Sequence, residues 1–479
     1  MLQKHAQHLF WRAGFGETLS VVKEAEKHSA KQVFKKMLKE SENFVPIAVV
    51  EPPDVAGDFR KLREMRMEKK ENGAGGFDRD KLKELQKERR EEQAKLNIAW
   101  LDLMSIDKGV LREKMAFFWH GHLVARSINA SFSQSYVNTL RKYALGNFGD
   151  LLLAVSKEPS MLQFLNNKQN KKRSPNENFA RELMELFTLG RGNYTEKDIK
   201  EVAKAFTGWD FDIKGNFIFR ERQHDEEEKT VFGKKGFFKG EDIIQMILEN
   251  KQTAVFITTK IYQNFVNENT SNPWHQGKIK DLAAKFYKTN YDIADLLENI
   301  YTSDWFYDKQ NIGTHVKSPV ELLVGLKRTL GLSFEEEQTN LFIQRVLGQV
   351  LLYPPNVAGW PGGKNWIDSS SLLFRMQIPA LIFTDKQPEI NAKSDGDINT
   401  DYQTRKRSFR ANINWEIYAK DFPDKEPKLM AEINDFVLQV SSTKAVVQGI
   451  QDKIKTDSKP ENVKKASIAL MMLPEYQLC

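Results

Sequence analysis

The stretch Ser174–Gly190, SPNENFARELMELFTLG, contains every signal expected of a single α-helix. Ser174 is a good N-cap residue, Pro175 suits the first helical turn, and Glu177 stands where a capping box needs a carboxylate. Gly190 can adopt the left-handed conformation that commonly ends a helix. The sequence therefore predicts a helix between these two ends.

Apolar residues spaced three and four apart, as in this stretch, recur through most of the 479 residues, whereas alternating runs are scarce. We therefore expect a mainly α fold, in which many helices form one large body. The exception is Trp209–Arg220, where apolar and polar residues alternate around Lys214-Gly215-Asn216. This pattern predicts one small β-hairpin inserted among the helices.

Changes in composition divide the chain into five predicted segments. They are N-terminal helices (1–50), a charged and exposed helical arm broken at residues 71–76 (51–108), a helical core that carries the motifs (109–384), a polar linker (385–408) and C-terminal helices (409–479).

Charge and hydropathy exclude several classes of protein. The chain has 72 Lys and Arg residues against 65 Asp and Glu, but the two signs are interleaved, so there is no strong nucleic-acid signal. No stretch approaches the roughly 18 consecutive apolar residues of a membrane span. The opening residues also lack the apolar segment of a signal peptide, which predicts a cytoplasmic protein.

The only cysteine is Cys479, which excludes a disulfide framework and a cysteine-based zinc site. Any metal site must therefore use histidine and carboxylate ligands.

Two glutamates of the predicted helix, Glu182 and Glu185, lie beside its apolar face. Glu185 falls near the helix C-terminus, where the helix dipole opposes a negative charge. Both carboxylates therefore need a cation nearby. Arginine or lysine would supply it, and a metal ion is the alternative.

Two histidines, His120 and His122, end the stretch EKMAFFWHGH. On an unbroken helix their side chains point about 160° apart and cannot hold one ion. If the helix instead ends near Trp119, an extended His-x-His places both imidazoles on one side, which is a common metal-ligand arrangement. His224 and Asp225, directly after the predicted hairpin, would add a third histidine and a carboxylate.

These residues together predict a site for a divalent Zn, Mn or Fe ion. The expected ligands are His120, His122, His224 and one glutamate, Glu182 or Glu185. The remaining glutamate or Asp225 would act as the catalytic base on a metal-activated water.

The loop Tyr353–Asp368, YPPNVAGWPGGKNWID, is irregular because of its prolines and glycines. Trp360 and Trp366, together with Asn356, suit the binding of a sugar or peptide chain. The alternative is that the tryptophans fill the core. The loop lacks the G-K-[ST] ending of a phosphate-binding loop, so nucleotide hydrolysis is not indicated.

Six motifs together resemble the bacterial family named domain of unknown function 1800, and they cover the chain nearly from end to end. They are HLFWRAGFG (8–16), EKMAFFWHGH (113–122), NENFARELMELFTLG (176–190), AFTGW (205–209), HD (224–225) and PPNVAGWPGG (354–363). The resemblance implies a large helical bacterial protein and assigns no activity. Many members of that family are exported, whereas this sequence shows no signal segment.

Two functions follow as hypotheses. The first is a metal-dependent hydrolase that acts on a glycan-like or other polymeric substrate. The alternative is a non-catalytic binding or scaffold protein in which the same side chains form a buried polar network. Convergence of the three histidines and one acid within about 5 Å would favour the enzyme, and divergence of His120 and His122 across a helix would favour the scaffold.

Overall fold

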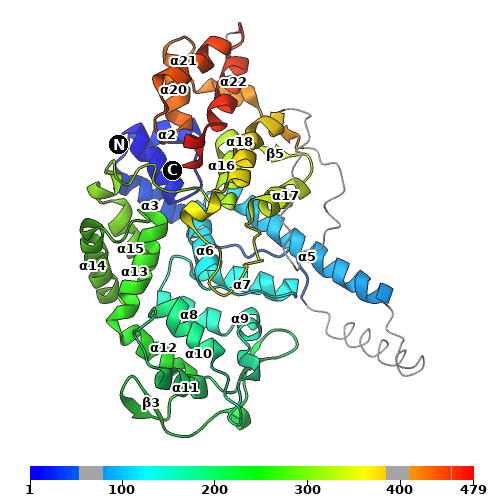
Figure 1. Cartoon of the computed structure of the whole chain (residues 1–479), viewed down its shortest axis with the longest axis vertical. Helices are drawn as coiled ribbons and strands as arrows, with labels where there is room; N and C mark the ends of the chain where they lie inside the picture. Colours follow the sequence, from blue (N-terminus) through cyan, green and yellow to red (C-terminus); the bar gives the residue numbers. More distant parts are fainter. Residues whose placement is uncertain (53–78, 384–408, 455) are drawn as a thin grey trace.

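The computed structural model describes residues 1–52, 79–383, 409–454 and 456–479, with side chains from residue 83 onward in the second range. Within these ranges the chain is mainly helical, which confirms the predicted fold class. Figure 1 shows α6 and α7 near the middle of the molecule, α20 to α22 at one end beside α2, and α10 to α12 at the other end.

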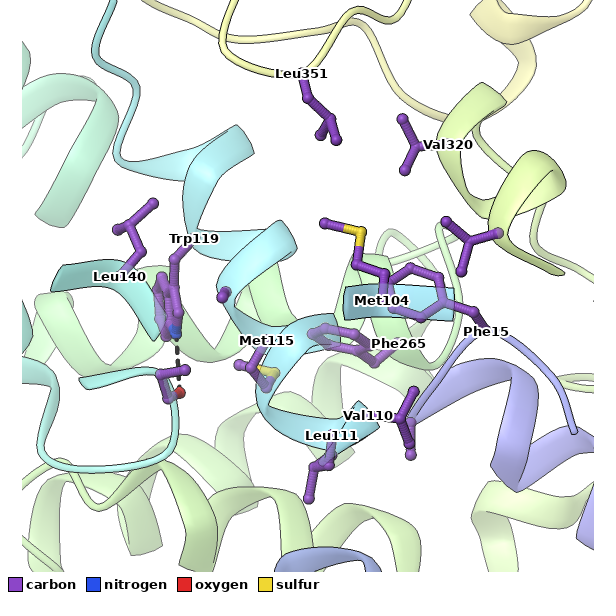
Figure 2. Close-up of a cluster of buried hydrophobic side chains, with 14 of the residues drawn as sticks. Phe15, Met104, Val110, Leu111, Met115, Trp119, Leu140, Phe265, Val320 and Leu351 are labelled. Atoms are coloured by element: carbon purple, nitrogen blue, oxygen red, sulfur yellow. Dashed lines mark hydrogen bonds between the residues drawn. The ribbon is translucent and has the colours of Figure 1, made fainter. Parts of the chain in front are cut away.

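Helices from three parts of the chain pack against one another and contribute to the core. They are α1 (Gln3–Arg12), α2 (Leu19–Glu26), α3 (Ala30–Glu40), α5 (Arg79–Ile106), α6 (Val110–His122), α7 (Ala130–Tyr143) and α16 (Pro319–Leu330). Helix α6 is almost wholly enclosed, with Leu111, Met115 and Trp119 fully buried. Figure 2 shows these side chains among Phe15, Leu140, Phe265, Val320 and Leu351, which come from other elements. The indole nitrogen of Trp119 donates to the Ala144 carbonyl at 3.1 Å.

The middle of the sequence forms the lower and left parts of Figure 1. Its helices are α8 (Phe148–Ser156), α9 (Pro159–Phe164), η1 (Asn167–Gln169), α10 (Asn178–Glu182), η2 (Leu183–Thr188), α11 (Glu196–Ala205), η3 (Glu221–Gln223), α12 (Gly240–Glu249), α13 (Lys251–Phe265), α14 (Pro273–Lys288), α15 (Ile293–Tyr301) and η4 (Asp304–Tyr307).

The remaining helices follow α16. They are α17 (Gln338–Leu347), η5 (Gly363–Trp366), α18 (Ser369–Phe383), α19 (Trp415–Lys420), α20 (Lys428–Val437), α21 (Lys444–Lys453), α22 (Lys459–Met471) and η7 (Pro474–Gln477). No helix among the described residues is long and apolar enough to cross a membrane.

The predicted hairpin is confirmed. Strand β1 (Trp209–Phe211) pairs antiparallel with β2 (Phe217–Phe219), and Gly215 in the turn has a positive φ of 88°. Two further pairs were not predicted, β3 (Lys229–Val231) with β4 (Lys234–Gly236) and β5 (Ser333–Phe334) with β6 (Ala411–Asn412). Their strands have two or three residues each, too few for an alternating pattern to stand out.

The predicted helix 174–190 is present, but it begins at Asn178 rather than at Pro175. The amide of Asn176 donates to the Asn170 side chain at 2.9 Å, and the amide of Asn178 donates to the Asn176 side chain at 3.0 Å. These local bonds compete with a helical start, so the expected capping box at Ser174 does not form.

The second half of this helix, η2, is π-helical. The amides of Leu189 and Gly190 both donate to the Met184 carbonyl, at 2.9 and 3.1 Å. Gly190 has a φ of 79° and ends the helix as predicted. A π-helical turn interrupts regular α spacing and is often found at functional sites.

The predicted charged arm is exposed only in part. Residues 53–78, with the predicted break at 71–76, and residues 384–408, with most of the predicted linker, lie outside the described residues. Residues 83–91 of α5 are mostly exposed, but Leu96, Trp100, Leu101 and Met104 belong to the core. The expectation of a solvated arm is therefore corrected for the second half of α5, where apolar residues at helical spacing stand among the charges. The segment boundaries themselves stay a prediction.

Helix α1 connects distant parts of the chain through Arg12. This buried guanidinium donates from Nη2 to the carbonyls of Val266 at 3.0 Å and Asn311 at 3.2 Å, and to the Thr314 hydroxyl at 3.0 Å. The side-chain amide of Gln7 donates to the Phe436 carbonyl at 3.2 Å. One short helix therefore fixes segments that follow it by more than 250 residues in the sequence.

Candidate functional site

A cleft of about 620 Å³ opens where several parts of the chain meet. Its walls are the end of α6, η2 with the turn after it, the helix α13 and the proline- and glycine-rich loop 353–368, and it is also lined by Glu268, Gln349 and side chains from residues 315–321. Four of the predicted site residues line this cleft, namely His122, Glu185, Trp360 and Trp366. The other five, His120, Glu182, Asn356, His224 and Asp225, are not part of its lining.

The extended His-x-His arrangement is not present, because α6 continues through His122. The amide of Leu123 still donates to the Trp119 carbonyl at 2.7 Å, so Gly121 lies inside the last turn and does not break the helix. His120 and His122 therefore lie on different faces of α6, the first in the core and the second in the cleft wall.

His120 is fully buried and serves the core. Its Nε2 accepts a hydrogen bond from the Leu352 amide at 3.1 Å, and its ring packs against Trp100 and Trp360. Burial lowers the pKa of His120 to about 3, so the ring is neutral and Nδ1 carries the proton. The backbone thus engages Nε2, and Nδ1 is buried with no hydrogen-bond partner among the described residues.

His122 holds two walls of the cleft together. Its Nε2 lies 3.1 Å from the Phe187 carbonyl, and its ring stacks on Phe118 with the centroids 5.9 Å apart. Burial lowers the pKa of His122 to about 4, and the hydrogen bond to the Phe187 carbonyl opposes this shift only in part. The imidazole is therefore neutral at pH 7 and donates its Nε2 proton to the carbonyl.

His224 and Asp225 form a separate cluster behind the β1–β2 hairpin. Nδ1 of His224 lies 2.9 Å from the Thr207 carbonyl, and the Asp225 carboxylate lies 3.4 Å from the buried Lys229 ammonium. Burial lowers the pKa of His224. Protein groups therefore engage Nδ1 of His224 and the carboxylate of Asp225.

The predicted ligand set is thus not assembled. In the ranges that the structure describes, no three His, Cys, Asp or Glu side chains gather in a way that would hold a metal ion. His120, His122, Glu182 and His224 do not fit a common ion, and binding of Zn, Mn or Fe by this protein stays a prediction.

The cation expected beside Glu185 is Arg191, whose Nε lies 2.5 Å from the carboxylate, and the Tyr194 hydroxyl donates to the same side chain at 3.0 Å. The bond from Arg191 lowers the pKa of Glu185. Glu182 behaves differently, because burial first and the charge of Glu185 second raise the pKa of Glu182. The catalytic role expected of Glu185 stays a prediction, although it does line the cleft.

A group of residues absent from the sequence-based predictions lies at the base of the cleft. Nε2 of His315 lies 3.0 Å from Glu321 Oε2, and the Lys114 ammonium lies 2.6 Å from Glu321 Oε1. The amide of Ser318 also donates to Glu321 Oε2 at 2.7 Å and thereby completes the capping box of α16. Three donors therefore surround one buried carboxylate.

Glu321 is ionised in this environment. Burial alone would raise the pKa of Glu321, but Lys114 and His315 outweigh it and hold the value well below the usual range. The charged Glu321 carboxylate accepts a hydrogen bond from His315 Nε2. Nδ1 is the nitrogen on the other side of the ring.

Glu268 stands on that other side. Its Oε1 lies 3.8 Å from His315 Nδ1, which has no hydrogen-bond partner within the described part of the chain. The Glu268 side chain is 39% exposed and the His315 side chain 9%. Glu268 is therefore the member of this group that a ligand in the cleft can reach, and His315 lies behind it.

The glycines of the loop make this arrangement possible. A Cβ on Gly363, which has a φ of 61°, would lie 2.3 Å from Glu268 Oε2. A Cβ on Gly359, with a φ of 78°, would lie 2.5 Å from the Gly121 carbonyl oxygen. The loop therefore lies directly against α6 and Glu268, at approaches that only glycine permits.

The two tryptophans of the loop both line the cleft, although Trp366 is largely buried and Trp360 is half-buried. Trp366 thus also contributes to the core, as the alternative interpretation expected. Asn356 shapes its own loop, because its side chain accepts the Ala358 amide at 2.9 Å. Its expected contact with a substrate stays a prediction.

Local sequence signals for the residues that pack around Glu321, beneath Glu268, were weak. Ser318-Pro-Val-Glu321 is a capping-box pattern, which predicts the start of a helix and not a site. Lys114 precedes Glu321 by 207 residues, and no local pattern joins them.

Comparison with known proteins yields a family and no characterised relative. No curated protein and no solved structure gives a significant match to the chain. The model of one family, described as "Protein of unknown function (DUF1800)", matches residues 8–478, which is nearly the whole sequence. The chain therefore belongs to the DUF1800 family.

Proposed function

We propose that the cleft binds a glycan-like or other polymeric substrate and hydrolyses it, with Glu268 as the carboxylate that transfers the proton. One observation carries this proposal: Glu268, His315 and Glu321 are aligned at the base of a cleft, with Glu268 reachable and Glu321 buried. A carboxylate that fixes an imidazole, which in turn faces a reactive group, is a recurrent arrangement in acid–base catalysis.

The buried members of the group determine the state of the reachable one. Lys114 keeps Glu321 charged, and Glu321 fixes the proton of His315 on Nε2. His315 Nδ1 therefore faces Glu268, with 3.8 Å between Nδ1 and Oε1. The imidazole thus lies between the two carboxylates and positions Glu268 beside the cleft. His315 and Glu321 are positioning residues in this scheme.

The proposed reaction uses water as the nucleophile. Glu268 removes a proton from a water molecule while the water oxygen forms a bond to the electrophilic atom of the scissile linkage. The bond between that atom and the leaving oxygen then breaks, and the same proton passes to the leaving oxygen. Atoms and charge balance without a further reactant.

The shape of the cleft supports a substrate with flat apolar faces. Trp360, Trp366, Phe117, Phe118 and Phe256 all contribute to its walls. Aromatic rings give large contact areas to sugar rings and similar units. A volume of about 620 Å³ is within the usual range of small-molecule sites and would hold a short section of a chain.

The test is a screen of polymeric glycans for release of reducing ends, made with the wild type and Glu268→Gln. We expect the substitution to lower the rate at least about 100-fold, the usual minimum for loss of an acid–base group. Glu241→Gln is the matched control, because Glu241 is half exposed, pairs with Lys157 and does not line the cleft. Equal rates for wild type and Glu268→Gln would refute the role of Glu268.

A second candidate function, a non-catalytic binding protein, is favoured by the histidines that were expected to be ligands. His120 contacts the backbone at Leu352, His122 at Phe187 and His224 at Thr207, as in a buried polar network. Calorimetric titration of the same glycans separates the two candidates. Tight binding with no turnover in the wild type would support the binding protein.

The predicted metal ion enters neither scheme. Elemental analysis of protein expressed with supplemented Zn, Mn and Fe tests it directly. A stoichiometric ion would support the prediction, and active protein without one would overturn it.

A further inference from the structure

We propose that Lys260 forms an anion-binding subsite of the cleft and that the polymer bound there is an acidic saccharide. The inference that this polymer is also cleaved rests on the proposed function, whereas the inference that it binds does not.

The first observation is the balance of charge in the cleft. Glu185 is paired with Arg191, and Glu321 is paired with Lys114. Glu268 faces His315. Lys260 also lines the cleft, and within the described ranges no carboxylate lies at ion-pair distance from its ammonium. Among the described residues that line the cleft, Lys260 is thus a cation with no carboxylate at ion-pair distance.

The second observation is how Lys260 is held. Its ammonium lies 5.3 Å from the centroid of the Phe256 ring, one turn earlier on α13, and the residue is partly buried. Burial lowers the pKa of Lys260, and no counter-charge opposes this shift. An ammonium that has lost part of its hydration and has no protein partner gains more from an incoming anion than a fully solvated one does.

The third observation is the position of Lys260 along the cleft. Lys260, Gln263 and Asn264 all line the cleft from α13, and their spacing places them on one face of the helix. Asn264 lies one turn beyond Lys260, about 6 Å along the axis, and Glu268 follows after the end of the helix. The anionic group would therefore be on the saccharide unit next to the unit that meets Glu268.

These observations favour a polymer with an anionic group on successive units. Aromatic walls suit the ring faces of a saccharide, and Lys260 suits a carboxylate or sulfate on the ring. Carboxylate and sulfate both present negatively charged oxygens to the ammonium, and the probes below distinguish them.

The experiment measures binding to the full chain by calorimetry. The probes are three oligosaccharides of equal length: a galacturonate oligomer, a sulfated oligomer and a neutral glucose oligomer. We expect the better of the two acidic probes to bind at least ten-fold more tightly than the neutral one, and this preference should weaken as salt is raised. Whichever acidic probe binds more tightly identifies the anion.

Lys260→Met should remove the preference, with at least a ten-fold loss for the acidic probe and little change for the neutral one. Lys260→Arg should keep most of the preference for the acidic probe. That result would show that the loss in Lys260→Met comes from the missing charge and not from a general loss of structure. Lys251→Met is the matched control, because Lys251 is also on α13 and near an aromatic ring, that of Tyr287, but does not line the cleft. Lys251→Met should leave all three affinities unchanged.

The outcomes of these measurements separate the anion subsite, the saccharide assignment and the proposed hydrolysis. Equal binding of acidic and neutral probes, or an unchanged preference in Lys260→Met, would overturn the anion subsite. Tighter binding of a glutamate oligopeptide than of either acidic saccharide would overturn the saccharide assignment. Lys260-dependent binding without cleavage would leave the subsite standing and would refute only the hydrolysis proposed above.

Discussion

Two of the described regions each combine a histidine, a carboxylate and a lysine, and only the first of them lines the cleft of about 620 Å³. At the base of the cleft, His315 bonds Glu321, which is paired with Lys114. Behind the β1–β2 hairpin, His224 stands beside Asp225, which is paired with Lys229. All six residues are buried.

The difference lies in what each histidine faces. His224 contacts the Thr207 carbonyl through Nδ1 and is not part of the cleft lining. His315 bonds the carboxylate through Nε2, and its Nδ1 faces Glu268. The comparison teaches that residue types alone do not make a site. What matters is whether one polar atom is left facing a space that a ligand can enter.

The largest effect on stability is expected for Glu321→Gln. This substitution leaves the Lys114 ammonium buried without its counter-charge, which should lower the free energy of unfolding by about 3–5 kcal/mol. Urea denaturation followed by circular dichroism measures it. Adding Lys114→Met to this variant should recover part of the loss. A loss below about 1 kcal/mol for Glu321→Gln would mean that the pair is not desolvated as described.

A smaller effect is expected in the second region for Lys229→Met. Here Asp225 keeps a second donor, the Glu227 amide at 3.0 Å, so we expect a loss of about 2–3 kcal/mol in the same denaturation assay. Binding and turnover in the cleft should be unchanged, because neither Lys229 nor Asp225 lines it. A Lys229→Met protein that folds normally but loses turnover would instead support the catalytic role that the sequence suggested for Asp225.

The smallest effect on stability is expected for Gly363→Ala, which adds a Cβ at a φ of 61° and against Glu268 Oε2. The left-handed conformation should cost about 1–2 kcal/mol. The turnover rate should fall further than the loss of folded protein explains, because the new methyl group displaces the Glu268 carboxylate. Gly362→Ala is the matched control, since a Cβ there meets no atom within 4 Å. Similar effects of both substitutions on turnover would break the link between this loop and Glu268.

Local signals predicted much of the fold. Helical spacing, the hairpin around Gly215 and the helix end at Gly190 follow from interactions between neighbours in the sequence, and each was found. The π-helical turn η2 was not predictable in this way, because residue propensities do not distinguish it from an α-helix. Burial of the second half of α5 was not predicted, because charged residues stand between its apolar residues, which are at helical spacing.

The site was predictable only where its residues belong to one short motif. The stretch that contains Glu185 and the loop with Trp360 and Trp366 were identified from their own composition, and both line the cleft. His315, Glu268 and Lys114 were missed because tertiary packing alone brings them together. The same packing decided the state of α6, where burial of Trp119 and His120 keeps the helix intact past Gly121.

The contacts of Arg12 have a consequence for biosynthesis. Its acceptors at Val266 and Asn311 are 254 and 299 residues further along the chain. At a synthesis rate of about 5–20 residues per second, Val266 leaves the ribosome roughly 13–50 seconds after Arg12. For that time the apolar face of α1 has no native partner from these segments. We therefore expect that α1 docks late in folding and that chaperones engage this segment during translation.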